Sequence, residues 1–95
     1  MKSRIDAPYE RGEPPVRFVY ILQSIDRPDQ FYTGLCSDVP QRLAAHNAGQ
    51  SSHTAKFKPW RLISYHYFAD NAVAASFEMY LKSGSGRAFA SKRLR

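Results

Sequence analysis

The sequence predicts a single α/β domain whose strands and helices follow one another in the order ββαβαα. Its 95 residues suit one domain and leave no room for a second. Three segments are rich in apolar, β-branched and aromatic residues and alternate with period two, as strands do. Segments with helix-capping residues and an apolar stripe at helical spacing follow the second and third of these strands.

The domain is expected to occupy residues 16–95, behind a flexible leader. Residues 1–15 are polar, contain three prolines and show no sustained period, which is typical of an unpacked segment. Residues 17–24 then predict a strand that is mostly apolar on both faces. After turn chemistry at residues 26–29, residues 31–37 predict a second strand and therefore a β-hairpin. If even positions pair with even positions, one face carries Tyr20, Tyr32 and Gly34.

A short helix is predicted to begin after Asp38. Its carboxylate can cap the helix, Pro40 suits the first turn, and Gln41 completes a capping box. Gly49 offers a left-handed stop after residue 47. Residues 50–59 are polar and show no period, which predicts a surface loop.

The second half is predicted to add a third strand and two helices. Residues 60–68 alternate and are rich in aromatic and β-branched side chains. Asp70 or Asn71 then caps a longer helix, which is predicted to stop at two glycines. A last short basic helix is predicted at residues 87–94. The apolar stripe of the longer helix consists of Val73, Phe77, Tyr80 and Leu81.

The charge of the chain is concentrated in its second half. Fourteen Lys and Arg against eight Asp and Glu leave a net charge of +6. Residues 1–47 hold equal numbers of basic and acidic side chains, whereas residues 48–95 hold eight basic ones and only Asp70 and Glu78 as acids. This asymmetry favours a nucleic-acid partner over an anionic membrane surface or a role in solubility alone. The longest apolar run, residues 18–22, is too short to span a membrane, and a cytoplasmic protein is expected.

Several classes of site are excluded by what the sequence lacks. Cys36 is the only cysteine and cannot form a disulfide within the chain. The three histidines lack the close Cys and His spacing of a zinc site. No glycine-rich phosphate loop or Gly-x-Ser-x-Gly motif is present, which argues against nucleotide hydrolysis and α/β-hydrolase chemistry.

A set of polar and aromatic residues on the predicted elements remains as the candidate site. Any single tyrosine is more often a packing residue than a catalytic one. Glu78 falls on the shoulder of the apolar stripe, where a carboxylate is costly unless it is paired or holds a cation. An i,i+4 ion pair with Lys82 is the simplest alternative. The set consists of Tyr20, Tyr32, Arg42, His46 and Glu78.

The order and spacing of these residues resemble the GIY-YIG nuclease superfamily. The similarity is to its small single-domain bacterial members, which are similar to the N-terminal nuclease domain of the excinuclease C subunit. The resemblance covers roughly residues 16–94 and implies a small three-stranded antiparallel sheet flanked by helices. It rests on Val19-Tyr20-Ile21, on Tyr32-Thr33-Gly34, on Arg42-x-x-x-His46-Asn47-x-Gly49, on Glu78 and on Leu81-Lys82-Ser83-Gly84.

The resemblance also implies a catalytic set. Tyr20 would position or deprotonate the attacking water, with His46 as one candidate proton acceptor. Arg42 would bind the phosphate, Tyr32 would hydrogen-bond the phosphate or the metal-bound water, and Glu78 would hold Mg²⁺ or Mn²⁺. The chain departs from the family pattern with Phe18 at the first motif's glycine and Ala90 where many catalytic members carry asparagine.

The predicted function is a divalent-metal-dependent endonuclease that acts on DNA and is structure-selective or weakly specific. Two alternatives stay open, a non-cleaving nucleic-acid-binding module on the same scaffold and a protein-interaction domain. The residues expected to contact the nucleic-acid backbone are His53, Thr54, Lys56, Lys58, Arg61, Arg87, Lys92 and Arg93.

Overall fold

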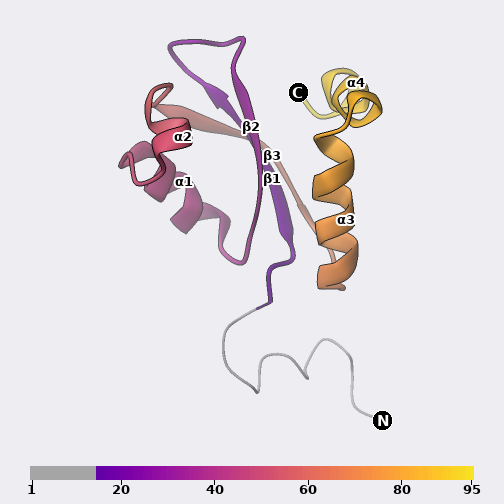
Figure 1. Ribbon diagram of the computed structural model, residues 1–95. Coiled ribbons are helices and arrows are strands. Elements are labelled where there is room, and N and C mark those ends of the chain that lie inside the picture. The colour runs from indigo at the N-terminus through magenta and orange to yellow at the C-terminus, as the bar shows by residue number, and fades with distance from the viewer. Residues whose placement is uncertain (1–14) are drawn as a thin grey trace.

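The computed structural model describes residues 15–95, which form a three-stranded sheet with helices on both faces (Figure 1). The strands are β1 (Phe18–Ser24), β2 (Phe31–Cys36) and β3 (Trp60–Tyr67), all antiparallel in the order β2-β1-β3. The predicted fold class is confirmed. The predicted leader lies outside the described residues except for its last position, and no described helix has the length and apolar character needed to cross a membrane.

The β-hairpin register places the candidate tyrosines on one face of the sheet. Tyr20 pairs with Gly34, and Leu22 pairs with Tyr32. Even positions therefore pair with even positions, as the alternation predicts. A side chain at position 34 would overlap the Tyr20 ring, because a Cβ built there falls on the phenol. Gly34 therefore makes the room that Tyr20 occupies.

The sheet separates two hydrophobic cores. On the face that carries Tyr20, the core contains Leu22, Cys36, Val39 and Trp60, and helix α1 (Val39–Asn47) covers it. On the opposite face, the core is formed by residues of β1, of α3 (Asn71–Leu81) and of α4 (Gly84–Arg93): Val19, Ile21, Ala74, Leu81 and Ala90. Both faces of β1 are therefore buried, which explains its nearly continuous run of apolar residues.

Helix α1 begins and ends as predicted, but the segment after it does not form only a loop. Asp38 accepts a hydrogen bond from the Gln41 amide at 3.0 Å, and Gly49 has a φ of +77°. Residues 50–59 were predicted to be a surface loop, and they contain helix α2 (Ser52–Ala55) with a buried Thr54. A helix of four residues is too short to show a helical period.

Helices α3 (Asn71–Leu81) and α4 (Gly84–Arg93) pack against the other face and differ from the prediction in two ways. Val73 and Tyr80 were assigned to the buried stripe but are 49% and 41% exposed, because the buried face is centred on Ala74 and Leu81. The glycines predicted to end α3 instead lie in the first turn of α4, which Ser83 caps. A side chain at Gly86 would overlap the backbone of Tyr80, so glycine allows this tight corner.

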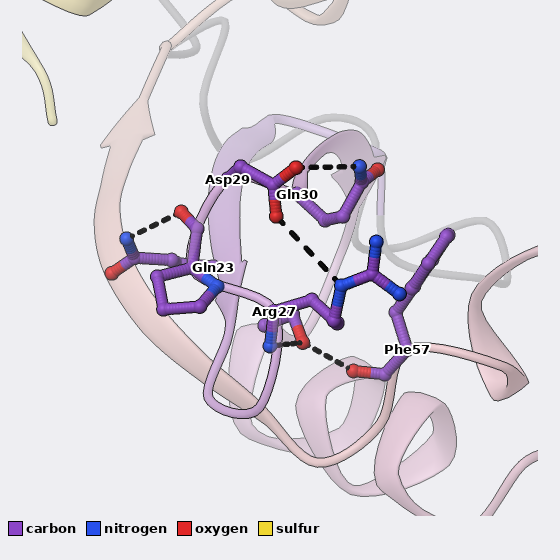
Figure 2. A network of polar contacts seen from close by, with 7 residues as sticks. Gln23, Arg27, Asp29, Gln30 and Phe57 are labelled. Carbon is purple, nitrogen blue, oxygen red and sulfur yellow. Dashed lines mark hydrogen bonds and ion pairs between the residues drawn. The ribbon is translucent and has the colours of Figure 1, made fainter.

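A network of polar contacts holds the hairpin turn against the segment that leads into β3 (Figure 2). The Ser24 hydroxyl donates to the Phe57 carbonyl at 2.6 Å and accepts from the Arg27 amide at 3.0 Å. Gln23 closes the turn through a 2.9 Å bond to the Pro28 carbonyl. This network fixes the position of the α2 segment, which carries part of the candidate site.

Candidate active site

A chain of hydrogen bonds connects β1, α1 and α2 inside the protein. The Tyr20 hydroxyl lies 2.9 Å from His46 Nε2, and His46 Nδ1 lies 2.8 Å from the Thr54 hydroxyl. All three residues are 1% exposed. These two hydrogen bonds therefore connect residues that are 26 and eight positions apart in the sequence.

One assignment of protons gives every hydrogen bond in this series a donor and an acceptor, running from the Tyr20 hydroxyl to the Ser51 carbonyl. The Thr54 hydroxyl can donate to the Ser51 carbonyl, 3.5 Å away, and accept from His46 Nδ1. Nε2 is then the unprotonated ring nitrogen and accepts from the Tyr20 hydroxyl. In this tautomer, His46 Nε2 can accept the phenolic proton of Tyr20.

The position of His46 is set by contacts around it. The Trp60 indole nitrogen donates to the Thr54 carbonyl at 2.9 Å, which holds α2 against β3. The Asn47 side chain bonds both backbone groups of Trp60, at 2.6 and 3.0 Å, which holds the end of α1 against the same strand. Tyr32 packs on His46 with 4.9 Å between ring centroids and also contacts His53 at 6.2 Å.

Burial and the neighbouring Arg42 perturb the titration of this pair. Burial raises the pKa of the Tyr20 phenol, and the Arg42 guanidinium opposes that rise. The pKa of His46 is lowered by burial first and by the positive charge of Arg42 second. In turn, interaction with Tyr20 raises the pKa of Arg42. His46 is therefore neutral at neutral pH, and Arg42 stays charged beside it.

These shifts predict a loss of stability in acid. Burial lowers the pKa of both His46 and His66, so near and below the usual histidine pKa of about 6.5 the unfolded chain binds more protons than the folded one. The free energy of unfolding should therefore fall as the pH drops from about 7 to 5. Urea denaturation across this range measures it, and His66→Gln should remove part of the pH dependence. A free energy that is constant between pH 7 and 5 would contradict the expectation.

Glu78 lies on the other side of the sheet from Tyr20, on α3. Its carboxylate is 14% exposed and pairs with the Lys82 ammonium at 2.5 Å, which is the i,i+4 contact predicted as the alternative role. The structure thus brings Tyr20, Tyr32, Arg42 and His46 into one cluster. Glu78 is not part of this cluster and lies on α3, in the layer that covers the other face of the sheet.

The donors available suit a metal site with one protein carboxylate. In residues 15–95, no three His, Cys, Asp or Glu side chains gather closely enough to hold an ion together. Mg²⁺ and Mn²⁺ prefer oxygen ligands, and Mg²⁺ usually keeps several waters, so a single carboxylate can suffice. Lys82 is 52% exposed and can leave Glu78 for solvent at small cost. Glu78 therefore fits as the ligand of a hard divalent ion.

Two clefts flank the cluster. One, of about 460 Å³, is lined by Arg42, His46 and the start of the α2 segment. The other, of about 360 Å³, lies between β2 and the corner of α3 and α4 and is lined by Tyr32, His53 and Lys82 among others. A ligand that entered these clefts would meet Arg42 and His46 in the first, and Tyr32 and the ion-pair partner of Glu78 in the second.

The predicted backbone-contacting residues are distributed unevenly around these clefts. His53 and Arg87 line the second cleft, and Lys56 lines a smaller hollow beside Tyr32. Thr54 is buried and bonds His46, so its hydroxyl faces the imidazole. The remaining four lie outside the residues that line these hollows: Lys58, Arg61, Lys92 and Arg93.

Sequence reasoning did not find two features of the site. The contact of Thr54 with His46 was missed because α2 has no period that would place Thr54 on a buried face. Arg95 lines the second cleft and was not predicted to contact a ligand. Its basic character was the available signal, but exposed arginines are common and most have no ligand.

Comparison with known proteins gives a family match and several relatives. The family model of the GIY-YIG catalytic domain matches residues 16–92. The chain is 39% identical over 83 residues to Structure-specific endonuclease subunit SLX1 of Scheffersomyces stipitis, covering 80% of this chain and 25% of that protein. It is 32% identical over 71 residues to a UPF0213 protein of Streptococcus pyogenes, covering 74% and 75% of the two chains. A UPF0213 protein of Lacticaseibacillus paracasei is 39% identical over 66 residues, which are 68% of this chain and 72% of the relative. No solved structure matches the chain.

Proposed function

We propose that this chain, which belongs to the GIY-YIG catalytic domain family, is an endonuclease that hydrolyses phosphodiester bonds of DNA with the help of a divalent metal ion. The proposed nuclease domain is residues 16–95. We further propose that it selects DNA by structure, or with weak sequence preference, since the SLX1 relative is named a structure-specific endonuclease. This chain spans a quarter of the length of that relative, so structure selectivity is a proposal for this chain.

The observation that supports this function best is the buried chain from Tyr20 through His46 to Thr54, with Arg42 beside it. A structural tyrosine needs one partner for its hydroxyl. This tyrosine has a neutral imidazole as its partner, and the imidazole is itself oriented by a second hydrogen bond. That is the arrangement of a general base held by an orienting group.

Proton movement in the proposed reaction runs from water toward His46. The raised pKa of Tyr20 means that its hydroxyl remains protonated in the free protein. Tyr20 would therefore orient the attacking water through its hydroxyl oxygen and give up its own proton only as His46 Nε2 accepts it. Thr54 would hold His46 in the tautomer that permits this transfer.

Charge on the phosphate would be stabilised by groups on both sides of the sheet. Arg42 is charged at every accessible pH and would form paired hydrogen bonds to the scissile phosphate. Tyr32 would donate a hydrogen bond to the same group. A Mg²⁺ or Mn²⁺ ion on Glu78 would supply Lewis-acid stabilisation of the developing negative charge.

The excess of basic residues in the second half of the chain supports a polyanionic substrate. We propose that these side chains follow the backbone on either side of the scissile bond, where contacts position the strand without reading its sequence. The proposed set is His53, Thr54, Lys56, Lys58, Arg61, Arg87, Lys92 and Arg93. For Thr54, the proposed contribution passes through His46, because its own hydroxyl is buried.

Cleavage assays on a panel of substrates test the proposal. Branched, single-stranded and plain duplex DNA, each labelled at one end, are incubated with the protein in Mg²⁺, in Mn²⁺ and in EDTA. We expect strand cleavage with either metal and none in EDTA, with branched DNA cut at least as fast as duplex. Binding without cleavage of any substrate would instead favour the non-cleaving nucleic-acid-binding module. Cleavage that is equally fast in EDTA would remove the metal from the mechanism.

A further inference from the structure

The cleft between β2 and the corner of α3 and α4 has a composition that the catalytic cluster does not explain. Its volume is about 360 Å³, and it lies beside β2, one of the two edge strands of the sheet. Side chains from both faces of that strand, Tyr32 and Thr33, reach it. The other walls come from His53 of α2 and from the helices of the opposite layer (Figure 1).

The lining residues include three basic side chains and no acidic side chain. They include Lys82, Arg87 and Arg95. The ammonium of Lys82 is already paired with Glu78, which leaves the two arginines as the uncompensated charges. Within residues 15–95, neither arginine has an acidic partner, so each can form a new ion pair without breaking one.

One of these arginines is held in place before any ligand arrives. The guanidinium of Arg95 lies 4.1 Å from the centroid of the Phe31 ring, a cation–π contact. Stacking on a ring leaves the N–H groups at the edge of the guanidinium available as donors. Arg95 therefore lies beside the cleft with its N–H groups available as donors.

We propose that this cleft binds a second phosphate of the DNA strand, next to the scissile one, through Arg87 and Arg95. Two guanidinium groups match the oxygens of a phosphodiester, and the hydroxyl of Thr33 adds a neutral donor. Tyr32 lines this cleft and packs on His46, so the second phosphate lies beside the catalytic cluster. The inference rests on the proposed function, and it assigns one phosphate of the DNA strand to this cleft.

Binding measurements in EDTA test the second phosphate site without involving cleavage. Anisotropy of a fluorescein-labelled branched DNA gives the dissociation constant and its salt dependence for the wild type and for Arg87→Gln with Arg95→Gln. We expect the double variant to bind about tenfold more weakly at low salt and its log–log salt slope to be shallower by about 0.9, since the contact to one phosphate is lost.

Arg27→Gln is the matched control. Like Arg95, Arg27 is exposed and lies over a phenylalanine ring, Phe57, but it belongs to the hairpin turn and does not line the cleft (Figure 2). It should leave the affinity within about twofold of wild type. If the double variant binds like the control, the second phosphate site is wrong, while cleavage by the wild type still supports the proposed function. If the wild type binds no DNA at all, both are wrong.

Discussion

Glu78→Gln is expected to reduce cleavage by at least about a thousandfold while leaving the fold and DNA binding in place. The change keeps the shape of the side chain and removes the negative charge that would hold the divalent ion. Loss of metal stabilisation of the transition state is worth several kcal/mol, and about 4 kcal/mol corresponds to a thousandfold in rate. Single-turnover cleavage at saturating protein measures it, and Mn²⁺ titration of each variant measures metal binding separately.

Lys82→Met is the control for this experiment, because it breaks the same ion pair from the other side. It removes the partner of Glu78 and keeps the carboxylate. Lys82→Met leaves a carboxylate that is only 14% exposed without its partner, so thermal unfolding of both variants is measured beside the rates to separate lost stability from lost activity. We expect the Met variant to cleave and the Gln variant not to. Equal losses in both would make Glu78 a helix ion-pair residue, as the simpler reading of the sequence has it.

Tyr20→Phe is expected to slow cleavage by about 10² to 10⁴. The ring and its packing are retained, so folding loses about one hydrogen bond, roughly 1 kcal/mol, plus the cost of leaving His46 Nε2 without its donor. Thermal unfolding checks stability, and single-turnover rates check activity. Tyr67→Phe is the matched control, because Tyr67 lies on β3 and is 48% exposed. An active Tyr20→Phe protein would remove this tyrosine from the mechanism.

A double variant tests whether Tyr20 and His46 act together in proton transfer. If His46 accepts the proton of Tyr20, adding His46→Ala to Tyr20→Phe should cost little beyond the single change, because groups that act as one unit are strongly non-additive. Full multiplication of the two losses would instead mean that His46 acts independently, for example as a phosphate contact from the first cleft.

The fold was predictable wherever the pattern was long enough to have a period. The β-hairpin, its even-to-even register and the capped start of α1 all follow from local chemistry at Asp38, Pro40 and the alternating strands. Helix α2 was missed because four residues show no period. The stripe of α3 was misplaced because small Ala74, not Val73, faces the sheet. Hydrophobicity alone ranks valine above alanine for burial, and only the close approach of the helix to the sheet reverses that order.

The candidate site was predictable in its residue types but not in its connections. The spacing placed Tyr20, Tyr32, Arg42 and His46 on elements that meet, and their roles remain proposals. The hydrogen bond from His46 to Thr54 depends on how α2 folds back on α1, which the sequence between them does not encode as a pattern. The free charges of Arg87 and Arg95 likewise depend on which acids lie nearby in space.

The position of β2 at the edge of the sheet has a consequence for the protein in the absence of DNA. An edge strand carries unpaired backbone groups that can pair with the edge of another molecule and start aggregation. The arginines beside this edge would hold two copies apart by repulsion, and a bound DNA strand would cover the same edge. Salt weakens both effects, because it screens the repulsion between the arginines of two copies and releases the DNA that covers the edge. If this surface binds DNA as proposed, its arginines would also limit the association of free protein molecules through the edge of β2.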